Sequence, residues 1–162
     1  MFLLSNKRIN YLLLTLLILI LQINFPSIIF FDNYKINLNL ILVYFTFLAL
    51  LNGSYKLILY AFLYGLIQDM VITIDQLGLL SFITSLTVFL LLSIRNYDIL
   101  WSLKMKYSSI FLVYLFHFLF YYFILYNDFF IIIFLISFFQ AFFSFAIFFL
   151  MATFFIKINN NV

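Results

Sequence analysis

The sequence predicts an all-α integral membrane protein in which six transmembrane helices are joined by short loops. Hydrophobic residues make up 69% of the 162-residue chain and charged residues only 8%, whereas a soluble domain carries about 25% charged residues. The apolar residues form long runs separated by short polar breaks, and lysine and arginine concentrate in alternate breaks. These three observations exclude a disordered chain, a coiled coil and a soluble enzyme domain.

Six apolar runs approach the length of about 20 residues that a helix needs to cross the hydrocarbon core of a bilayer. The runs cover residues 9–30, 37–51, 56–74, 78–94, 106–126 and 129–156. The second is the shortest, and the sixth is long enough to tilt or to extend past the hydrocarbon. Helices are preferred to barrel strands because residues 131–136 are apolar at every position, whereas a barrel strand alternates polar and apolar residues. We therefore expect one membrane domain over residues 1–162.

The positive charges predict how these spans are oriented, because lysine and arginine stay on the cytoplasmic side of a membrane. If the amino terminus is cytoplasmic, only Lys35 falls in an outer segment. The inner segments then hold the other seven: Lys7, Arg8, Lys56, Arg95, Lys104, Lys106 and Lys157. Both termini should be cytoplasmic. The first run is longer than a signal-peptide core and no small-x-small cleavage site follows it, so we expect it to remain as a span.

Asp69 is the most informative residue, because a carboxylate inside a span is costly unless it faces the protein interior or a wet cavity. Gly65 shares its helix face at a spacing of four, which favours close helix approach beside a polar group. Equal counting outward from the turn near Gln76 places Thr84 of the next span at a similar depth. We expect Asp69 to bond hydroxyl and backbone groups of that span and to lock a hairpin. Ion coupling and partner binding are the alternatives.

His117 and Gln140 form a second intramembrane polar pair. Counting from the turn at Asn127 and Asp128 puts them at nearly equal depth on consecutive antiparallel helices, so a bond between them is expected. The chain has no cysteine, no glutamate and no second histidine to complete a transition-metal site.

Motifs for catalysis are missing from the sequence. It contains no glycine-rich phosphate loop, no suitably spaced pair of carboxylates and no Ser-His-Asp set that would meet at one depth. The scattered basic residues do not form a nucleic-acid-binding patch. The sequence therefore predicts a protein that is not an enzyme, with no cofactor, no metal and no nucleic-acid partner.

The central part of the chain, about residues 36–95, resembles the MreD family of bacterial rod shape-determining membrane proteins. The resemblance rests on the apolar run 38–51, on Tyr-Gly-Leu-Ile-Gln-Asp-Met at positions 64–70, on Leu-Gly-Leu at 77–79 and on Arg95. The family shares a Gly-Leu-x-x-Asp element in the third span followed by Leu-Gly after a short outer turn. The chain departs from the family at the start of the second span, where it has Asn-Leu-Asn at positions 37–39 in place of Pro-Asp or Pro-Asn.

This resemblance implies a multi-pass scaffold of the bacterial inner membrane that supports lateral peptidoglycan synthesis. MreD-like proteins bind the single-span protein MreC and act through it with MreB, RodZ, RodA and a class B penicillin-binding protein. The implied fold is similar to the six-helix substrate-binding subunits of energy-coupling-factor vitamin transporters. The residues expected to have structural or partner-binding roles are Gly65, Gln68, Asp69, Gly78, Thr84, His117 and Gln140.

Two other functions are compatible with the same residues. The binding subunit of a vitamin transporter needs several polar contacts near the outer face, and Asp69, Gln68, Gln22 and Asn24 could supply them. A small ion-coupled carrier needs Asp69 to exchange ions in a wet path.

Overall fold

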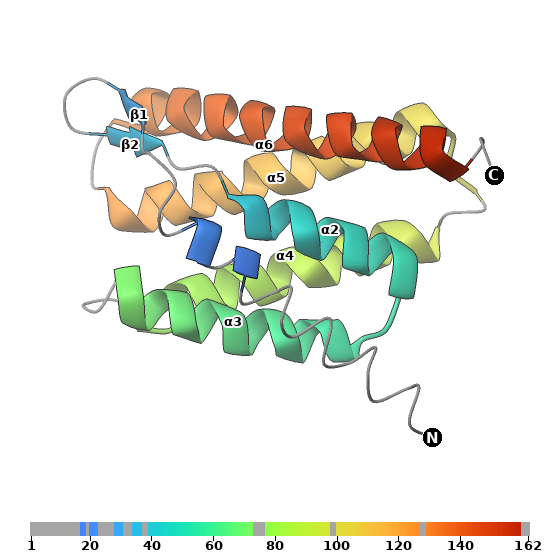
Figure 1. The fold of residues 1–162 in the computed structure, drawn as a ribbon. Helices are drawn as coiled ribbons and strands as arrows, with labels where there is room; N and C mark the ends of the chain where they lie inside the picture. The colour runs from blue at the N-terminus through green and yellow to red at the C-terminus, as the bar shows by residue number, and fades with distance from the viewer. Residues whose placement is uncertain are drawn as a thin grey trace. The chain divides into compact units, whose positions relative to one another are not determined.

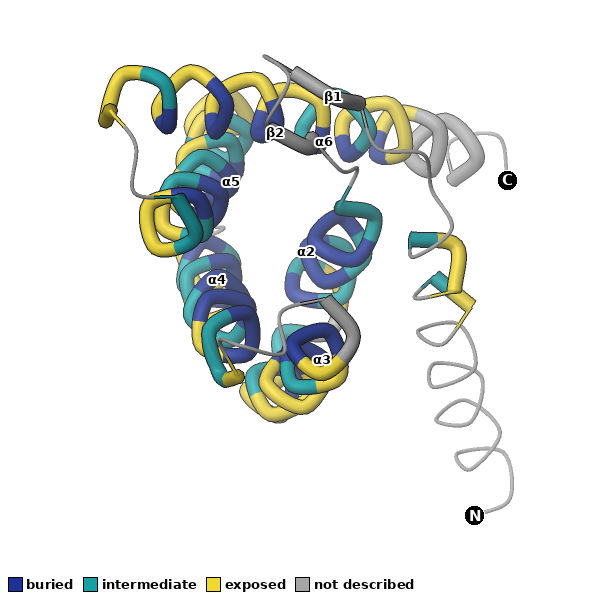
Figure 2. The backbone as a smooth tube through the Cα atoms, turned by 90° about the vertical axis from the view of Figure 1, so that its left-hand side faces the viewer, coloured by how far each residue is buried: buried dark blue, intermediate teal, exposed yellow. Residues whose placement is uncertain are grey.

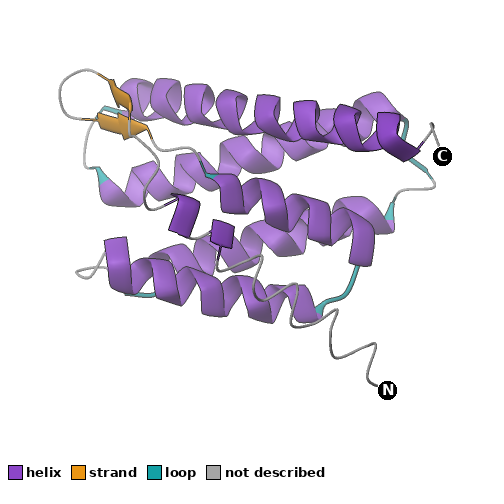
Figure 3. Ribbon diagram, viewed as in Figure 1, coloured by secondary structure: helices purple, strands orange, loops and turns teal. Residues whose placement is uncertain are grey.

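The computed structural model describes residues 17, 18, 20–22, 28–30, 34–36, 39–72, 77–97, 100–126 and 129–159. Almost all of them are helical, and the exceptions are short turns and one small β-hairpin (Figure 3). The chain divides into two compact units, Met1–Ile41 and Leu42–Val162. The expected single membrane domain over residues 1–162 stays a prediction, and each unit is described by itself.

The first unit contains a β-hairpin where the sequence predicts the end of a span and a loop. Strands β1 (Ile28–Phe30) and β2 (Tyr34–Ile36) pair antiparallel, with Ile29 opposite Lys35. The prediction of a span through residue 30 is therefore wrong in its last three residues. Proline at position 26 opposes a continuous helix through this run, since it lacks the N–H that a helix interior needs.

Five helices follow the hairpin: α2 (Leu40–Asn52), α3 (Lys56–Ile72), α4 (Leu79–Asn96), α5 (Leu103–Leu125) and α6 (Phe130–Asn159). They match the second to sixth predicted runs to within a few residues. The earlier part of the chain is helical at residues 17, 18 and 20–22, inside the first predicted run. Within the first unit, the side chain of Gln22 accepts a hydrogen bond from the backbone N–H of Ile41 at 3.2 Å.

The helices of the second unit pack mainly against their neighbours in sequence. Helix α3 packs on α4, α4 on α5, and α5 on α6, and the axes run roughly side by side (Figure 1). Helix α2 joins this bundle through side chains: Phe45 packs edge-on against Tyr64 of α3 with ring centroids 5.8 Å apart, and Phe47 lies 5.1 Å from Phe148 of α6. Each helix turns its buried face toward the inside of this arrangement (Figure 2).

Three described helices are long and apolar enough to cross a membrane: Leu79–Asn96, Leu103–Leu125 and Phe130–Thr153. Helices α2 and α3 are shorter, with 13 and 17 residues. At a rise of 1.5 Å per residue they extend about 20 Å and about 26 Å. The structure therefore supports a membrane-embedded helical protein with three spans of sufficient length, and six spans remain a prediction.

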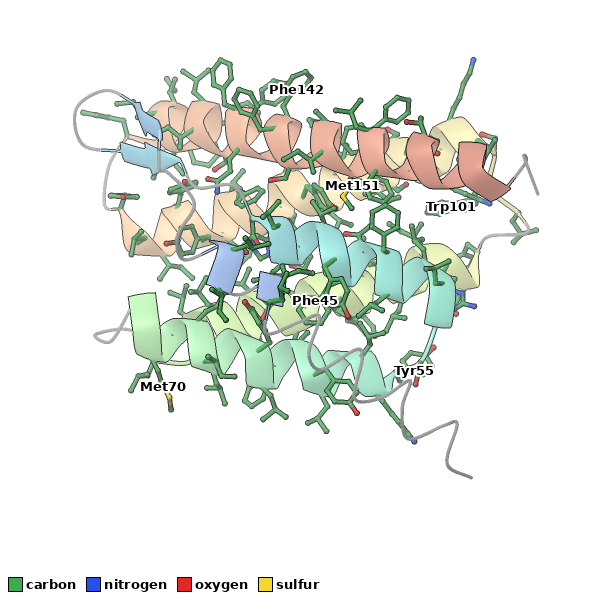
Figure 4. The ribbon with its side chains drawn as sticks, in the orientation of Figure 1. Phe45, Tyr55, Met70, Trp101, Phe142 and Met151 are labelled. Atoms are coloured by element: carbon green, nitrogen blue, oxygen red, sulfur yellow. The ribbon has the colours of Figure 1, made fainter. Side chains whose placement is uncertain are left out.

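Large apolar side chains cover the outside of the second unit. Met70 on α3 is 64% exposed and Phe142 on α6 is 53% exposed, whereas Phe45 on α2 is only 2% exposed and points into the bundle (Figure 4). A water-soluble bundle would place its charged residues on such an outer face. Exposed phenylalanine and leucine along the lengths of α3, α5 and α6 are typical of helices that face lipid.

Candidate functional site

Asp69 lies near the end of α3 and holds the first turn of α4. Its side chain is fully buried. The carboxylate accepts hydrogen bonds from the backbone N–H groups of Leu80 at 2.9 Å and of Gly78 and Ser81 at 3.1 Å each. These groups belong to the first turn of a helix, where backbone N–H groups have no partner within the helix. Asp69 therefore acts as a cap supplied by the neighbouring helix, and its negative charge lies at the end of α4 that favours anions.

The sequence around Gly78 explains why α4 needs a cap from outside. Gly78 is the N-cap residue of α4 and has no side chain that could accept from the next amides. Its φ of +100° is a conformation that suits glycine, and a Cβ atom there would meet nothing within 4 Å. Glycine thus provides the turn, and Asp69 provides the acceptor that serine, aspartate or asparagine would normally supply at this position.

Gly65 allows α3 and α4 to approach closely beside this cap. A Cβ atom at Gly65 would lie 2.3 Å from the Cα of Ser81 and 2.6 Å from Oγ1 of Thr84. The contact with Ser81 is with backbone, which cannot rotate away. One turn earlier, Ala61 is also fully buried. Ala61, Gly65 and Asp69 therefore form a small, close-packed stripe of the kind that lets helices approach each other in membranes.

Thr84 also joins the two helices, one turn away from Asp69. Its hydroxyl lies 3.0 Å from the carbonyl oxygen of Ala61 and 2.7 Å from that of Leu80. A Cβ atom at Gly65, one turn before Asp69, would lie 2.6 Å from Oγ1 of Thr84, so the expectation that Thr84 lies level with Asp69 is off by about one helical turn. Equal counting from the turn fails because the carboxylate of Asp69 faces the very start of α4. Gln68, the neighbour of Asp69 in the sequence, is also buried.

His117 and Gln140 are both buried, but each bonds to a residue other than the one expected. Nδ1 of His117 lies 2.8 Å from the hydroxyl of Thr87 on α4. That hydroxyl also lies 2.7 Å from the carbonyl oxygen of Ile83 on its own helix. Gln140 accepts from the hydroxyl of Tyr122 on α5. The predicted His117–Gln140 bond is therefore wrong, because His117 faces α4 while Tyr122 occupies the side of α5 that faces α6.

A third bond of this kind connects α5 to α2. The hydroxyl of Tyr114 lies 2.7 Å from that of Thr46, which donates to the carbonyl of Leu42. Tyr114 is fully buried. Helix α5 thus bonds to three neighbours through Tyr114, His117 and Tyr122. Sequence reasoning missed Thr46, Tyr114 and Tyr122, and the available signal was a lone threonine inside the apolar run of α2.

The bond between Thr87 and His117 leads to a direct prediction. Changing Thr87→Val keeps the shape of the side chain but removes the hydroxyl that bonds the buried Nδ1 of His117. We expect the free energy of unfolding in detergent to fall by about 1 kcal/mol, the usual size for an interhelical hydrogen bond in a membrane protein. Ser93→Ala is the control, because the hydroxyl of Ser93 bonds only within its own helix near the surface. Equal stability of the two variants would refute this role for Thr87.

Among the residues that the structure describes, no three or more His, Cys, Asp or Glu residues lie close together.

Comparisons of the chain with protein-family models, with curated proteins and with solved structures gave no match.

Proposed function

We propose that the chain is a non-enzymatic membrane scaffold of the MreD type, which binds an MreC-like protein in the bacterial inner membrane. In this role it supports lateral peptidoglycan synthesis and rod shape. Its further partners, reached through the MreC-like protein, are MreB, RodZ, RodA and a class B penicillin-binding protein. The proposal combines the sequence resemblance around Asp69 with the way in which that residue is used in the fold.

One observation favours a scaffold over a carrier: the carboxylate of Asp69 is held by three backbone N–H groups of α4. A carboxylate that exchanges an ion during transport must leave its partners in each cycle. Here such a step would remove the cap from the first turn of α4. The arrangement therefore supports a role in which Asp69 fixes the shape of the α3–α4 hairpin.

The bonds of α5 support the same role. They join α5 to α2, α4 and α6 through buried side chains, and the bundle offers mostly apolar side chains on its outside. A partner that consists of one transmembrane helix and a soluble domain could dock on such an apolar face. A rigid bundle holds that face in one arrangement, which lowers the entropy lost on binding.

Six crossings with both termini cytoplasmic are part of the proposal. The hydroxyl of Tyr55, next to the start of α3, accepts a hydrogen bond from Asn96 at the end of α4. The start of α3 and the end of α4 are therefore on the same side, together with the nearby start of α5. Lys56, Arg95, Lys104 and Lys106 lie in these segments, and this supports a cytoplasmic position for that side.

Single cysteines test this orientation, because the chain has no cysteine of its own. Leu77 is 62% exposed in the turn before α4, and Leu103 is 69% exposed at the start of α5. We expect Leu77→Cys to react with a membrane-impermeant maleimide in intact spheroplasts, and Leu103→Cys to react only in inside-out vesicles. The unmodified chain is the control for background. Reaction of both cysteines from one side would refute the proposed orientation.

Co-purification tests the proposed function. The chain is expressed with the MreC-like protein of the same organism, and a tag on the chain should recover that partner after solubilisation in mild detergent. Depletion of the chain should turn rod-shaped cells round. Recovery of the chain without the MreC-like protein, together with unchanged cell shape after depletion, would refute the proposal.

A further inference from the structure

Among the described residues of the second unit, the basic residues and the one carboxylate lie toward opposite ends. Among its described residues, the cations lie where α3 and α5 begin and where α4 and α6 end: Lys56, Arg95, Lys104, Lys106 and Lys157. The one carboxylate among them is Asp69, in the last turn of α3, near the opposite end. Among the described residues this end carries cations only; Asp98, three residues after Arg95 in the sequence, lies outside them.

Arg95 occupies an unusual place at this basic end. It is half-buried in the last turn of α4, and its guanidinium group lies directly against Gly53. A Cβ atom at Gly53 would be 1.9 Å from Nη1 and 2.4 Å from Cζ of Arg95, and Gly53 has a φ of +57°. The positive φ favours glycine at this position, and the absence of a side chain leaves room for the guanidinium against the turn between α2 and α3.

The guanidinium group of Arg95 has an N–H group in this turn that lacks a hydrogen-bond acceptor in the described part of the chain. Nη1 of Arg95 is buried, and it has no hydrogen-bond partner among the described residues. A guanidinium remains charged at any physiological pH, and a buried N–H without an acceptor is costly. Arg95 as a whole is partly exposed, so an acceptor from outside the protein can approach its guanidinium group.

The surroundings of Arg95 are typical of the depth at which lipid headgroups lie. The rings of Tyr97 and Trp101 stack with their centroids 5.8 Å apart, and tyrosine and tryptophan favour the membrane–water interface. Close by in the chain, Leu100 is 78% exposed and Leu103 is 69% exposed. Such exposed leucines suit contact with acyl chains, and a water-soluble anion would gain nothing from them.

We propose that this end of the bundle binds one anionic phospholipid, whose headgroup phosphate is held by the guanidinium of Arg95. A phosphate presents several oxygens to the planar fork of an arginine, so one ligand can satisfy more than one N–H group. Lys56 adds positive charge at the same end, and Leu100 and Leu103 contact the acyl chains. This inference goes beyond the proposed function and does not depend on an MreC-like partner.

Native mass spectrometry of the full chain in neutral detergent tests this site. Phosphatidylglycerol, phosphatidylcholine and inorganic phosphate are added separately in an ammonium acetate solution of about 0.5 M, which screens surface attraction. We expect one molecule of phosphatidylglycerol to bind about tenfold more tightly than phosphatidylcholine. Inorganic phosphate should not bind. Equal binding of the two lipids, or saturable binding of inorganic phosphate, would overturn the proposal.

Three variants locate the site. Arg95→Gln removes the charge and the fork, and it should weaken phosphatidylglycerol binding about tenfold, the effect of one lost charge-assisted hydrogen bond. Arg95→Lys keeps the charge but loses the fork, and it should also weaken binding. Lys104→Gln is the matched control, because it removes one exposed charge at the same end and should change binding less than about twofold at this ionic strength. Equal effects of Arg95→Gln and Lys104→Gln would overturn the assignment to Arg95, as would full binding by Arg95→Lys.

Discussion

Replacing Asp69 by alanine is expected to destabilise the protein by about 4 kcal/mol. The substitution leaves the N–H groups of Gly78, Leu80 and Ser81 without their acceptor at the buried start of α4. Each such loss costs about 1–3 kcal/mol, and the first turn of α4 also loses a favourable charge at its positive end. The free energy of unfolding in detergent, followed by the loss of helical circular dichroism, measures the effect.

Asp69→Asn is the matched comparison. An asparagine keeps the shape of the side chain and one acceptor oxygen, which can accept from Gly78 and Ser81. Its NH₂ group, however, would face the backbone N–H of Leu80, and two donors cannot form a hydrogen bond with each other. We expect about half the loss seen for alanine. If the Asp69→Ala variant and the wild type unfold at the same temperature, the carboxylate of Asp69 does not cap the first turn of α4.

Replacing Gly65 by leucine is the second substitution with a large expected effect. The first carbon of any side chain there would be 2.3 Å from the Cα of Ser81, so α3 and α4 must move apart. This movement also pulls Asp69 away from the start of α4. We expect a loss of about 3 kcal/mol or more, and about 1–3 kcal/mol for Gly65→Ala, which introduces the same clash with fewer atoms.

Ile67→Phe provides the control for Gly65→Leu. Ile67 is 44% exposed on the outer side of α3, so a larger apolar side chain there should extend into lipid or detergent. We expect the unfolding temperature of this variant to stay close to that of the wild type. Equal destabilisation by the two substitutions would mean that α3 tolerates no added volume anywhere, and the argument from the contact with Ser81 would fail.

Composition and run length were sufficient to predict the helices, because lipid requires backbone hydrogen bonds to close within each segment. The second to sixth runs correspond to α2–α6. The end of the first run was mispredicted, since hydropathy alone does not register that residues 28–30 form a strand after a proline. Six full crossings do not follow from run length, because α2 has only 13 residues.

The candidate residues were predictable, but their partners were only partly so. The prediction that Asp69 bonds the backbone of the next helix is confirmed, because an embedded carboxylate must find donors and the nearest free ones begin the next helix. The partner of His117 was not predictable from depth. Counting residues gives the position of a side chain along the helix axis, but not the direction in which the side chain points. The step of five residues from His117 to Tyr122 rotates that direction by about 140° about the axis.

Tyr114 and Tyr122 could not be found from the sequence for a different reason. The chain has 12 tyrosines and 26 phenylalanines, so a tyrosine that bonds across helices is not distinguishable from one that only packs. Only the arrangement of α2, α5 and α6 shows which hydroxyl groups meet Thr46 and Gln140.

The most direct test of the scaffold proposal is how much MreC-like partner remains bound to Asp69→Asn, Asp69→Ala, Gly65→Ala and Gly65→Leu, measured beside the unfolding temperature of each variant. If Asp69 acts by fixing the α3–α4 hairpin, retention of the partner should fall in the same order as stability, and Asp69→Asn should retain more than Asp69→Ala. Loss of the partner from an Asp69→Asn protein that unfolds at the wild-type temperature would contradict this account, because the charge and not the shape of the hairpin would then be what the partner requires.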